Sequence, residues 1–439
     1  MHINIIHNLN TVSNTTNDLK DIPIPSNTEI HNTEVITFGC RLNIYESEII
    51  KQNIKAANLS NVIVFNTCSV TQEAERQAKQ QIRKAKKDNP NVQIIVTGCA
   101  AQNDPEMFAK MTEVDKVIGN EEKLHSHNYK IDDNKVVVND IMSVKDTANH
   151  LITAFDGKTR AFIQIQNGCD HRCTFCIIPL GRGNNRSVAI GSIVEQVRVL
   201  LNAGYQEIVL TGVDVTAYGS DLPGKPTLAQ MIRRLLALVP NLKRLRLSSI
   251  DVAEIDSDLF NLMAHEQRIM PHFHISLQSG DNMILKRMKR RHKRQEVIDF
   301  CKEIRAKRTN VAFGADIIAG FPTETDEMFL NTANLIEEAN LQYLHVFPYS
   351  PRPKTPAARM PQVQNDVKKN RAKILRQIGE NNLNQFMHLH NNKNVDILIE
   401  SNNKGHTDNF IPVHFQSDVI EGTLQNRTIS YFNNKYMIA

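Results

Sequence analysis

Hydrophobic positions in the early part of the chain predict strands that alternate with helices. Short runs rich in β-branched residues are each followed by stretches with the helical period of 3.6 residues. Helical stretches are expected at 43–52, after the strand at 62–67 up to about residue 88, and near 105–112. This alternation predicts a parallel sheet covered by helices. Its expected strands are EVITF (34–38), VIVFNT (62–67), QIIVT (93–97) and, at an edge, VVV (136–138).

The middle of the chain repeats the same strand and helix pattern six times. Six such units resemble an incomplete version of the eightfold βα barrel, in which functional side chains gather at the carboxyl ends of the strands. The expected strands are AFIQIQ (161–166), EIVLTGV (207–213), KRLRLSSI (243–250), HFHISLQ (272–278), VAFGADIIAG (311–320) and QYLHVFPYS (342–350).

The last part, after a helix near 361–386, contains short strand-like runs at 395–401, 410–415 and 428–439. A small antiparallel β-barrel is the expected structure of this tail. The fold class is therefore α/β with a terminal β-barrel. The predicted organisation is a disordered extension over 1–31, a parallel α/β domain over 32–148, a six-unit barrel over 155–375 and the terminal barrel over 376–439.

The composition of the 439 residues fits a globular protein with real cores, since 41% are hydrophobic. No run of about 18 apolar residues indicates a transmembrane helix. The Asn- and Thr-rich start lacks the basic and apolar segments of a signal peptide. We therefore expect a cytoplasmic protein without a membrane partner, in which the seven cysteines stay reduced and can bind metals. Disulfides are the weaker alternative.

Three cysteines, Cys169, Cys173 and Cys176, lie in the motif GCDHRCTFC directly after the strand at 161–166. A structural zinc site takes four protein ligands, for which His171 could be offered. However, this spacing differs from that of zinc ribbons. A [4Fe–4S] cluster needs one ligand for each of its four irons, so three cysteines leave one iron open for another ligand. The alternatives are a zinc knuckle or three buried thiols.

A second set of three cysteines follows three strands of the early part. Cys40, Cys68 and Cys99 stand in ITFGC, VFNTC and IVTGC, at the same place relative to each strand. Carboxyl ends of parallel strands gather at one sheet edge, where ligands bind. This placement predicts a second three-ligand cluster, and three separate buried cysteines are the alternative. The remaining Cys301 lies on an apolar helix face and is expected in the core.

The spacing Cys-x-x-x-Cys-x-x-Cys resembles the signature of the radical S-adenosylmethionine (SAM) superfamily. The resemblance implies that the open iron binds SAM and that Cys169, Cys173 and Cys176 form the catalytic centre, with Phe175 shielding the cluster. Further strand ends fit a SAM site, although each could be ordinary turn chemistry. The expected SAM-binding residues are Gly212, Asp214, Ser276 and Gln278.

Nearly the whole of residues 33–439 resembles the methylthiotransferases. This family pairs a three-cysteine domain with a radical SAM barrel and a small β-barrel called TRAM. The resemblance implies two [4Fe–4S] clusters, of which the auxiliary one carries sulfur, and two roles for SAM as methyl donor and radical source. The matching stretches include FGCRLNIYESE (38–48), FNTCSVTQEAERQAKQ (65–80), TGCAAQ (97–102), GCDHRCTFCIIPLGRG (168–183), HISLQSGDNMILKRMKRRH (274–292), AGFPTET (319–325) and FPYSPRPKTPAARM (347–360).

The stretches NTCSVTQEAERQAKQ and SLQSGDNMILKRMKRRH look most like the branch that modifies threonylcarbamoyladenosine in tRNA. The expected partners are then a tRNA anticodon loop, an electron donor protein and a sulfur donor. Alternative substrates within the family are an isopentenyl-type adenosine in tRNA and an aspartate of a ribosomal protein. A non-catalytic iron–sulfur scaffold is a more remote alternative.

The net charge of +5 is unevenly spread, because the basic excess lies in the middle stretch 155–375. Within it, the run KRMKRRHKR (286–294) follows the fourth barrel strand. Such runs neutralise phosphates and make binding sensitive to salt. We therefore expect this run to contact tRNA, with Arg290, Arg291 and Arg294 among its contacts. A solvated helix face is the alternative.

Overall fold

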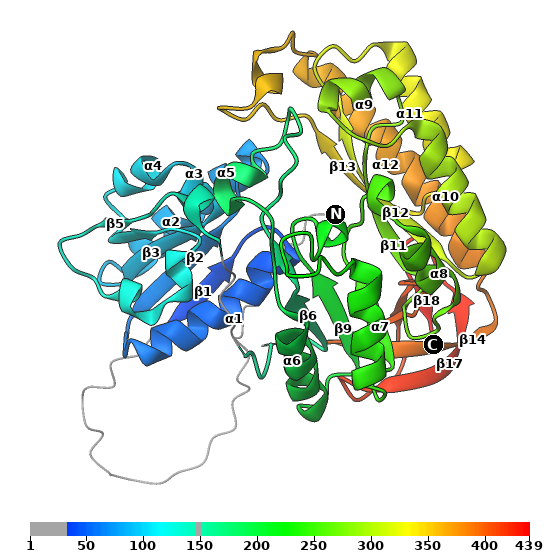
Figure 1. Ribbon diagram of the computed structural model, residues 1–439, viewed down its shortest axis with the longest axis horizontal. Helices are drawn as coiled ribbons and strands as arrows, with labels where there is room; N and C mark the ends of the chain where they lie inside the picture. The colour runs from blue at the N-terminus through cyan, green and yellow to red at the C-terminus, as the bar shows by residue number, and fades with distance from the viewer. Residues whose placement is uncertain (1–32, 146–150, 156) are drawn as a thin grey trace, which may run out of the picture.

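The computed structural model describes residues 33–145, 151–155 and 157–439, so the predicted disordered extension lies outside the described residues. Three parts follow one another along the chain (Figure 1): an α/β unit, a partial barrel of alternating strands and helices, and a small closed β-barrel. The α/β fold class expected from the sequence is confirmed, and the exact domain boundaries stay a prediction.

The first part is a five-stranded parallel sheet with its strands in sequence order. All four predicted strands are present, and the short strand β4 was not predicted because three residues carry no readable period. The strands are β1 (Glu34–Thr37), β2 (Val62–Thr67), β3 (Gln93–Gly98), β4 (Lys116–Ile118) and β5 (Val136–Val137). The helices are α1 (Arg41–Ala56), α2 (Gln72–Asp88), α3 (Cys99–Asn103) and α4 (Pro105–Ala109).

Helix α1 joins the first two parts of the molecule. Its Ile50 and Ile54 pack with residues of the parallel sheet, whereas its Tyr45 and Ile49 belong to the hydrophobic core of the barrel. The helix is therefore apolar on more than one face, as expected of a helix buried between two layers. Its N-terminus lies at the carboxyl edge of the sheet, next to Cys40.

The second part contains the six predicted strands, all parallel, in the order in which they occur along the chain. Two three-stranded groups are joined where the Ile250 N–H donates to the His274 carbonyl (2.9 Å) and the Ser276 N–H donates to the Ile250 carbonyl (2.9 Å). The strands are β6 (Arg160–Gln164), β9 (Glu207–Thr211), β10 (Arg244–Leu247), β11 (His272–Gln278), β12 (Ala312–Ala319) and β13 (Tyr343–Pro348).

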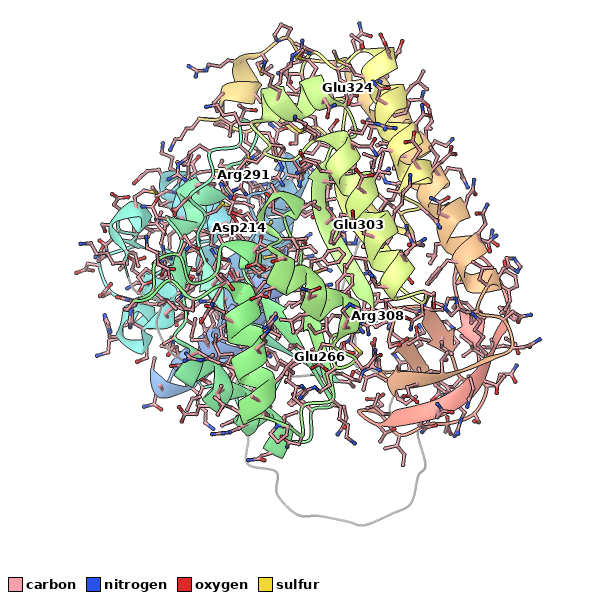
Figure 2. All side chains as sticks on the ribbon, turned by 45° about the vertical axis from the view of Figure 1, so that its right-hand side comes forward. Asp214, Glu266, Arg291, Glu303, Arg308 and Glu324 are labelled. Atoms are coloured by element: carbon pink, nitrogen blue, oxygen red, sulfur yellow. The ribbon has the colours of Figure 1, made fainter. Side chains whose placement is uncertain are left out.

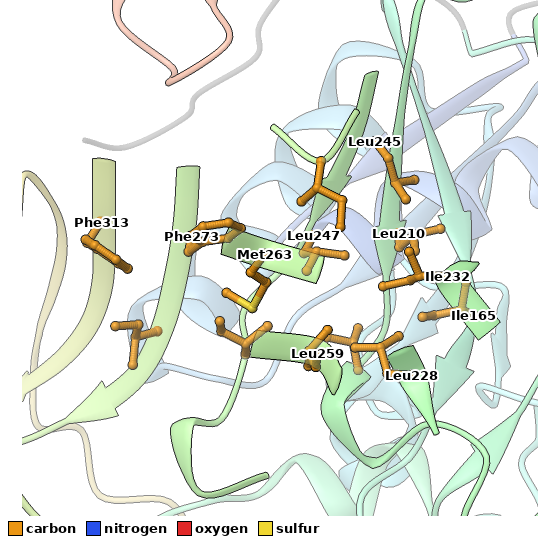
Figure 3. Packing of buried hydrophobic residues seen from close by; sticks show 14 of the residues in the cluster. Ile165, Leu210, Leu228, Ile232, Leu245, Leu247, Leu259, Met263, Phe273 and Phe313 are labelled. Carbon is orange, nitrogen blue, oxygen red and sulfur yellow. The ribbon is translucent and has the colours of Figure 1, made fainter. Parts of the chain in front are cut away.

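Helices cover the outside of these strands, and the largest hydrophobic core lies between the strands and the helices. Figure 3 shows Leu210 and Leu247 of the strands packed against Ile232, Leu259 and Met263 of two covering helices. The covering helices are α6 (Ile190–Asn202), α7 (Leu228–Leu238), α8 (Ser257–His265), α10 (Arg294–Lys307) and α11 (Asp326–Glu338). Shorter elements lie near the mouth: β7 (Gln166–Asn167), α5 (Ile178–Arg182), β8 (Arg186–Ser187) and α9 (Asn282–Met288).

The inner face of the partial barrel is polar at the amino ends of its strands. Glu207 is buried there and forms ion pairs with Arg246 (2.8 Å) and Arg244 (3.0 Å) of the neighbouring strand. Because side chains alternate along a strand, the leucines between these charged residues face the helices instead. A charged network thus closes the end of the barrel opposite to its mouth.

The terminal barrel docks at this closed end. Arg160 forms an ion pair with Glu400, and its guanidinium lies 4.9 Å from the centre of the Phe410 ring. Long helix α12 (Asn365–His388) leads into the barrel, whose closure confirms the predicted terminal β-barrel. One strand pair of the barrel is parallel. Its strands are β14 (Lys393–Ile399), β15 (Lys404–Thr407), β16 (Pro412–His414), β17 (Leu424–Tyr431) and β18 (Met437–Ile438).

None of the helices in the described part of the chain combines the length and the apolar composition needed to cross a membrane.

Candidate functional site

The three cysteines of the first part meet at the carboxyl edge of the parallel sheet. Cys40, Cys68 and Cys99 follow β1, β2 and β3, whose last residues are paired in register. A Cβ atom on Gly39 would lie 2.9 Å from the Cys68 sulfur, so only glycine allows the chain to pass so close. Gly39 also has a φ of +97°, which glycine adopts without strain. The predicted convergence of these three thiols is thus present in the structure.

A buried network of charges lies beside this cysteine set. Arg182 of α5 donates from Nε to the Cys99 sulfur (3.1 Å) and pairs with both carboxylate oxygens of Glu46 on α1. Lys123 donates to the same carboxylate (2.7 Å) and to Asn120 (2.7 Å). Although burial disfavours the charged carboxylate, Arg182 and Lys123 hold the pKa of Glu46 below its usual value.

This network was not predicted, and it connects the two cysteine sets. Arg182 ends the short helix that follows the loop with Cys169, Cys173 and Cys176, yet its guanidinium touches Cys99. Asn120 also reaches across, to the carbonyl of Gly181. Sequence spacing could not reveal these partners, because Glu46 and Arg182 are distant in the chain and meet only in the folded protein.

The second cysteine set lies in the loop at the mouth of the barrel. The Cys169 N–H donates to the Gly183 carbonyl (3.0 Å), and the Cys176 N–H donates to the Cys173 carbonyl (3.1 Å). Gly168 has a φ of +72°, and a Cβ there would lie 1.8 Å from the Asn184 carbonyl oxygen. Glycine is therefore required at this position if the loop is to close.

Hydrogen bonds of the Gln166 side chain connect this loop to the end of strand β9. Its Nε2 donates to the Gly168 carbonyl (2.6 Å), and its Oε1 accepts from the N–H groups of Val213 (2.9 Å) and Asp214 (2.8 Å). A Cβ on Gly212 would come within 2.7 Å of the same Oε1 atom. The predicted SAM-binding residues Gly212 and Asp214 therefore lie against the cysteine loop.

The Asp214 carboxylate and His171 lie beside Cys169, and a second carboxylate lies beside His171. The Asp214 carboxylate is 3.6 Å from the Cys169 sulfur and 3.0 Å from Nε2 of His171. His171 also lies 3.2 Å from the Glu254 carboxylate. Hydrogen bonds to Asp214 and then Glu254 raise the pKa of His171 to about 10, so the ring is an imidazolium at neutral pH. Figure 2 labels Asp214 and Arg291 on the mouth side of the barrel, away from Arg308.

Arg290 brings the basic run to the other side of the loop. Its guanidinium lies 3.8 Å from the Cys173 sulfur and donates to the Asp251 carboxylate (3.0 Å) and the Ser276 carbonyl (2.8 Å). Ser276 thus contributes its backbone to the mouth. Gln278, which has a φ of +70°, ends strand β11 at the same mouth.

The arginines of the basic run pair with carboxylates of the chain, so the run is only partly available to phosphates, and its contact with tRNA stays a prediction. Arg290 and Arg291 pair with the Asp251 carboxylate, each at 3.0 Å, and Arg294 pairs with Glu338. Arg290 is nearly buried, with 8% of its side chain exposed. The sequence shows a run of like charges but not the acidic side chains that fold onto it.

The turn after strand β12 is held by a helix cap and a buried ion pair. Thr325 caps α11 by accepting from the Met328 N–H (3.3 Å), and Glu324 pairs with Arg371 of α12 (2.8 Å).

Phe175, expected to shield the cluster, packs edge to face on Phe321 with ring centres 6.5 Å apart. Cys301 is fully buried in the barrel core.

The thiols fit a metal cluster better than a single ion. Among the described residues, groups of three candidate ligands with all atoms within 4.8 Å of one another include no more than one cysteine each. A tetrahedral zinc site needs its sulfurs closer together than that, with Zn–S distances of about 2.3 Å. Burial raises the pKa values of Cys68 and Cys176 to about 12, and a bound metal would favour their thiolate forms.

Comparison with known proteins gives this site its family. The radical SAM superfamily model matches residues 163–336, and the model of uncharacterized protein family UPF0004 matches residues 32–119. The chain is 65% identical over 404 residues to the threonylcarbamoyladenosine tRNA methylthiotransferase MtaB of Rickettsia prowazekii, covering 92% of this chain and 96% of that protein. The chain belongs to the radical SAM methylthiotransferases. It is thus a transferase whose family uses SAM and [4Fe–4S] clusters.

Other relatives are named for two different modified adenosines. The MtaB protein of Aquifex aeolicus is 35% identical over 86% of this chain and 95% of its own length. A tRNA-2-methylthio-N(6)-dimethylallyladenosine synthase of Ehrlichia chaffeensis is 31% identical over 76% of this chain and 80% of its own length. The radical SAM methyltransferase TsrM of Kitasatospora setae superposes with a TM-score of 0.56 at 13% identity, over 74% of each chain, which shows a shared fold alone.

Proposed function

We propose that this protein converts N6-threonylcarbamoyladenosine next to the tRNA anticodon into 2-methylthio-N6-threonylcarbamoyladenosine. The observation that carries the proposal is the 65% identity to the Rickettsia prowazekii protein named for this substrate, over nearly the full length of both chains. Relatives named for dimethylallyladenosine share 31–33% over 76–78% of this chain. Modification of an isopentenyl-type adenosine is therefore the second candidate.

Under this proposal, the six cysteines hold two [4Fe–4S] clusters, one at the sheet edge and one at the barrel mouth. When bound, the mouth cluster supplies the electron that cleaves SAM, and the edge cluster supplies sulfur. The donor sets support this assignment, because each offers three thiols and leaves one iron open. Burial raises the pKa of the Cys40 thiol, and the nearby positive charge of Arg182 acts against this shift.

The protein's own contribution is to fix the two sites relative to each other. Arg182 and Glu46 form a buried ion pair between the helix after the mouth loop and the helix after Cys40. Both side chains are at most 2% exposed, so water does not compete for their hydrogen bonds. A target carbon must meet first a radical and then sulfur, and a rigid connection keeps that path short.

Gly212, Asp214, Ser276 and Gln278 are proposed to hold SAM. Gly212 and Asp214 follow β9, Ser276 and Gln278 belong to the last residues of β11, and Asp214 lies beside the Cys169 thiol. In the present arrangement the imidazolium of His171 holds the Asp214 carboxylate at 3.0 Å. A SAM ammonium group would compete with that imidazolium for the same carboxylate.

The proposal also names partners. Each turnover consumes electrons and one sulfur atom that leaves with the product, so an electron donor protein and a sulfur donor must replenish the site. The tRNA has to present its adenosine to the barrel, and splaying the base out of the anticodon loop is the general way to expose it. Because the proposed substrate is tRNA, the proposed cellular location of the protein is the cytoplasm.

A complementation experiment tests the proposed function. The chain is expressed in a bacterial strain that lacks its own threonylcarbamoyladenosine methylthiotransferase, and tRNA nucleosides are analysed by mass spectrometry. We expect 2-methylthio-N6-threonylcarbamoyladenosine to reappear with the intact chain and to stay absent with Cys173→Ala. The chain is also expressed in a strain that lacks its isopentenyladenosine methylthiotransferase. If it restores only the methylthio-isopentenyl nucleoside, the second candidate is favoured.

A further inference from the structure

We propose that Arg41 binds the carboxylate of the threonylcarbamoyl arm and thereby selects this substrate. The inference rests on the proposed function and deepens it by naming a specificity-determining residue. It is carried by the position of Arg41 beside Cys40, by the absence of a counter-ion among the described residues, and by the arrangement of charges around its guanidinium.

Arg41 begins helix α1 and is the residue directly after Cys40. Its electrostatic neighbours are Arg160 and Arg246, which lie on strands of the barrel, together with Asp316 and Glu207. The side chain therefore extends from the sheet edge toward the inner face of the barrel. Because Arg160 and Glu207 begin their strands, a group bound to Arg41 would lie beside the edge cysteines and deeper in the barrel than the mouth. A base that reacts at the mouth would then point its arm into the barrel toward Arg41.

Arg41 is enclosed, yet its charge is not paired by the described part of the chain. There it makes no hydrogen bond and no ion pair within 4.0 Å, whereas the buried Arg182 and Arg246 make several. An arginine side chain stays charged at neutral pH. The residue keeps some accessible surface, so a ligand can reach it.

The acidic side chains near Arg41 are already committed to other partners. Asp316 lies between His274 (3.0 Å) and His345 (3.2 Å) on the two neighbouring strands. Glu207 is shared by Arg244 and Arg246. These carboxylates satisfy other groups, so the charge of Arg41 is left for an anion from outside the described chain.

The chemistry of the substrate matches this guanidinium. A threonylcarbamoyl arm ends in a carboxylate, which arginine binds with two parallel hydrogen bonds. An isopentenyl arm has no charge and no hydrogen-bonding group, and it would leave the enclosed guanidinium unsatisfied. The carboxylate of SAM and a tRNA phosphate share the same anionic chemistry, so the test must separate these sources.

The experiment compares reconstituted wild-type protein with Arg41→Gln on two tRNAs that differ only at the arm. One carries the free threonylcarbamoyl carboxylate and the other carries its methyl ester. We expect the wild type to prefer the free acid by about 10- to 100-fold in kcat/KM, the range of a hydrogen-bonded charge pair, and Arg41→Gln to lose this preference. Lys55→Gln, on an exposed position of the same helix, should retain it.

The outcomes separate the possible anions and the two proposals. An equal loss on both tRNAs, with slower SAM cleavage in the absence of tRNA, would assign Arg41 to SAM, and an equal loss of tRNA affinity alone would assign it to a phosphate. Either result overturns the inference, as does an unchanged preference. Failure of the wild type on the free-acid tRNA would instead refute the proposed function. If Arg41→Gln loses its iron, the wild-type protein alone can be used. The free threonylcarbamoyl nucleoside and its methyl ester are then compared as inhibitors of the wild-type reaction on tRNA. Equal inhibition by the two nucleosides would overturn the inference.

Discussion

At the scale of single residues, the site combines thiols that the sequence reveals with polar side chains that it does not. The six cysteines could be identified because their spacing and their places after strands are visible in the chain. Arg182, Glu46 and Gln166 could not, because their partners come from distant segments and no spacing connects them. Long-range hydrogen bonds of this kind exist only after the fold has brought their ends together.

The two cysteine sets should separate in function. Cys173→Ala should abolish SAM cleavage, because the barrel mouth loses a cluster ligand. Cys68→Ala should leave production of 5′-deoxyadenosine at least partly intact while ending methylthiolation, since its thiol lies at the sheet edge. Chromatography of reaction products measures both activities. Normal SAM cleavage by Cys173→Ala would show that the mouth loop is not the catalytic centre.

The buried Arg182 should matter for stability as well as for the site. Arg182→Met leaves the carboxylate of Glu46 with Lys123 alone, in a place where both partners are almost fully buried. Breaking such a pair costs about 3–5 kcal/mol of unfolding free energy. The matched control is Arg233→Met, which removes an exposed pair with Asp258 and should cost about 0–1 kcal/mol. Denaturant unfolding of both variants gives the comparison, and similar costs would contradict a structural role for the network.

At the scale of elements, hydrophobic patterning predicts the long strands and helices and misses some of the short ones. All six barrel strands were expected within a few residues of their ends, because their apolar faces pack against helices. Strands β4 and β15 were missed, because the three residues of β4 show no clear period and the sequence KGHT of β15 contains no apolar residue. The basic run suggests one continuous charged surface in the sequence, yet its arginines fold back onto Asp251 and Glu338.

The basic run should still bind tRNA through its lysines. Lys286, Lys289 and Lys293 are exposed, and replacing all three by Gln should weaken tRNA binding. The slope of log affinity against log salt should become shallower by about 0.7–0.9 for each phosphate that is no longer neutralised. As a control, Gln replaces the exposed Lys243, Lys302 and Lys307 instead. Binding titrations at several salt concentrations measure the slope, and equal slopes for the two triple variants would favour a merely solvated surface.

At the scale of the whole molecule, the barrel mouth and the terminal barrel lie at opposite ends of the strands. The terminal barrel is attached through Arg160, Arg246 and Phe410 at the amino ends, whereas the cysteine loop lies at the carboxyl ends. The order of the three parts was predictable from the sequence. Their docking was not, because it depends on contacts between a loop of the tail and the first residues of barrel strands.

The whole molecule should bind two clusters. After anaerobic reconstitution we expect about eight iron atoms per chain, four from each three-cysteine set. Removing Cys40, Cys68 and Cys99 together should halve the iron content and leave the mouth cluster in place. Iron analysis with absorption spectra checks this expectation. About four irons in the intact chain, or zinc in their place, would contradict it.

The central claim is tested most directly by an assay with purified, reconstituted protein and two tRNAs. One tRNA carries N6-threonylcarbamoyladenosine and the other carries isopentenyladenosine, and each is incubated with SAM, a reductant and a sulfur source. Mass spectrometry of the digested tRNA then identifies the nucleosides. The proposed function predicts a methylthio group on the threonylcarbamoyl nucleoside and none on the other. Methylthiolation of the isopentenyl tRNA alone would contradict it.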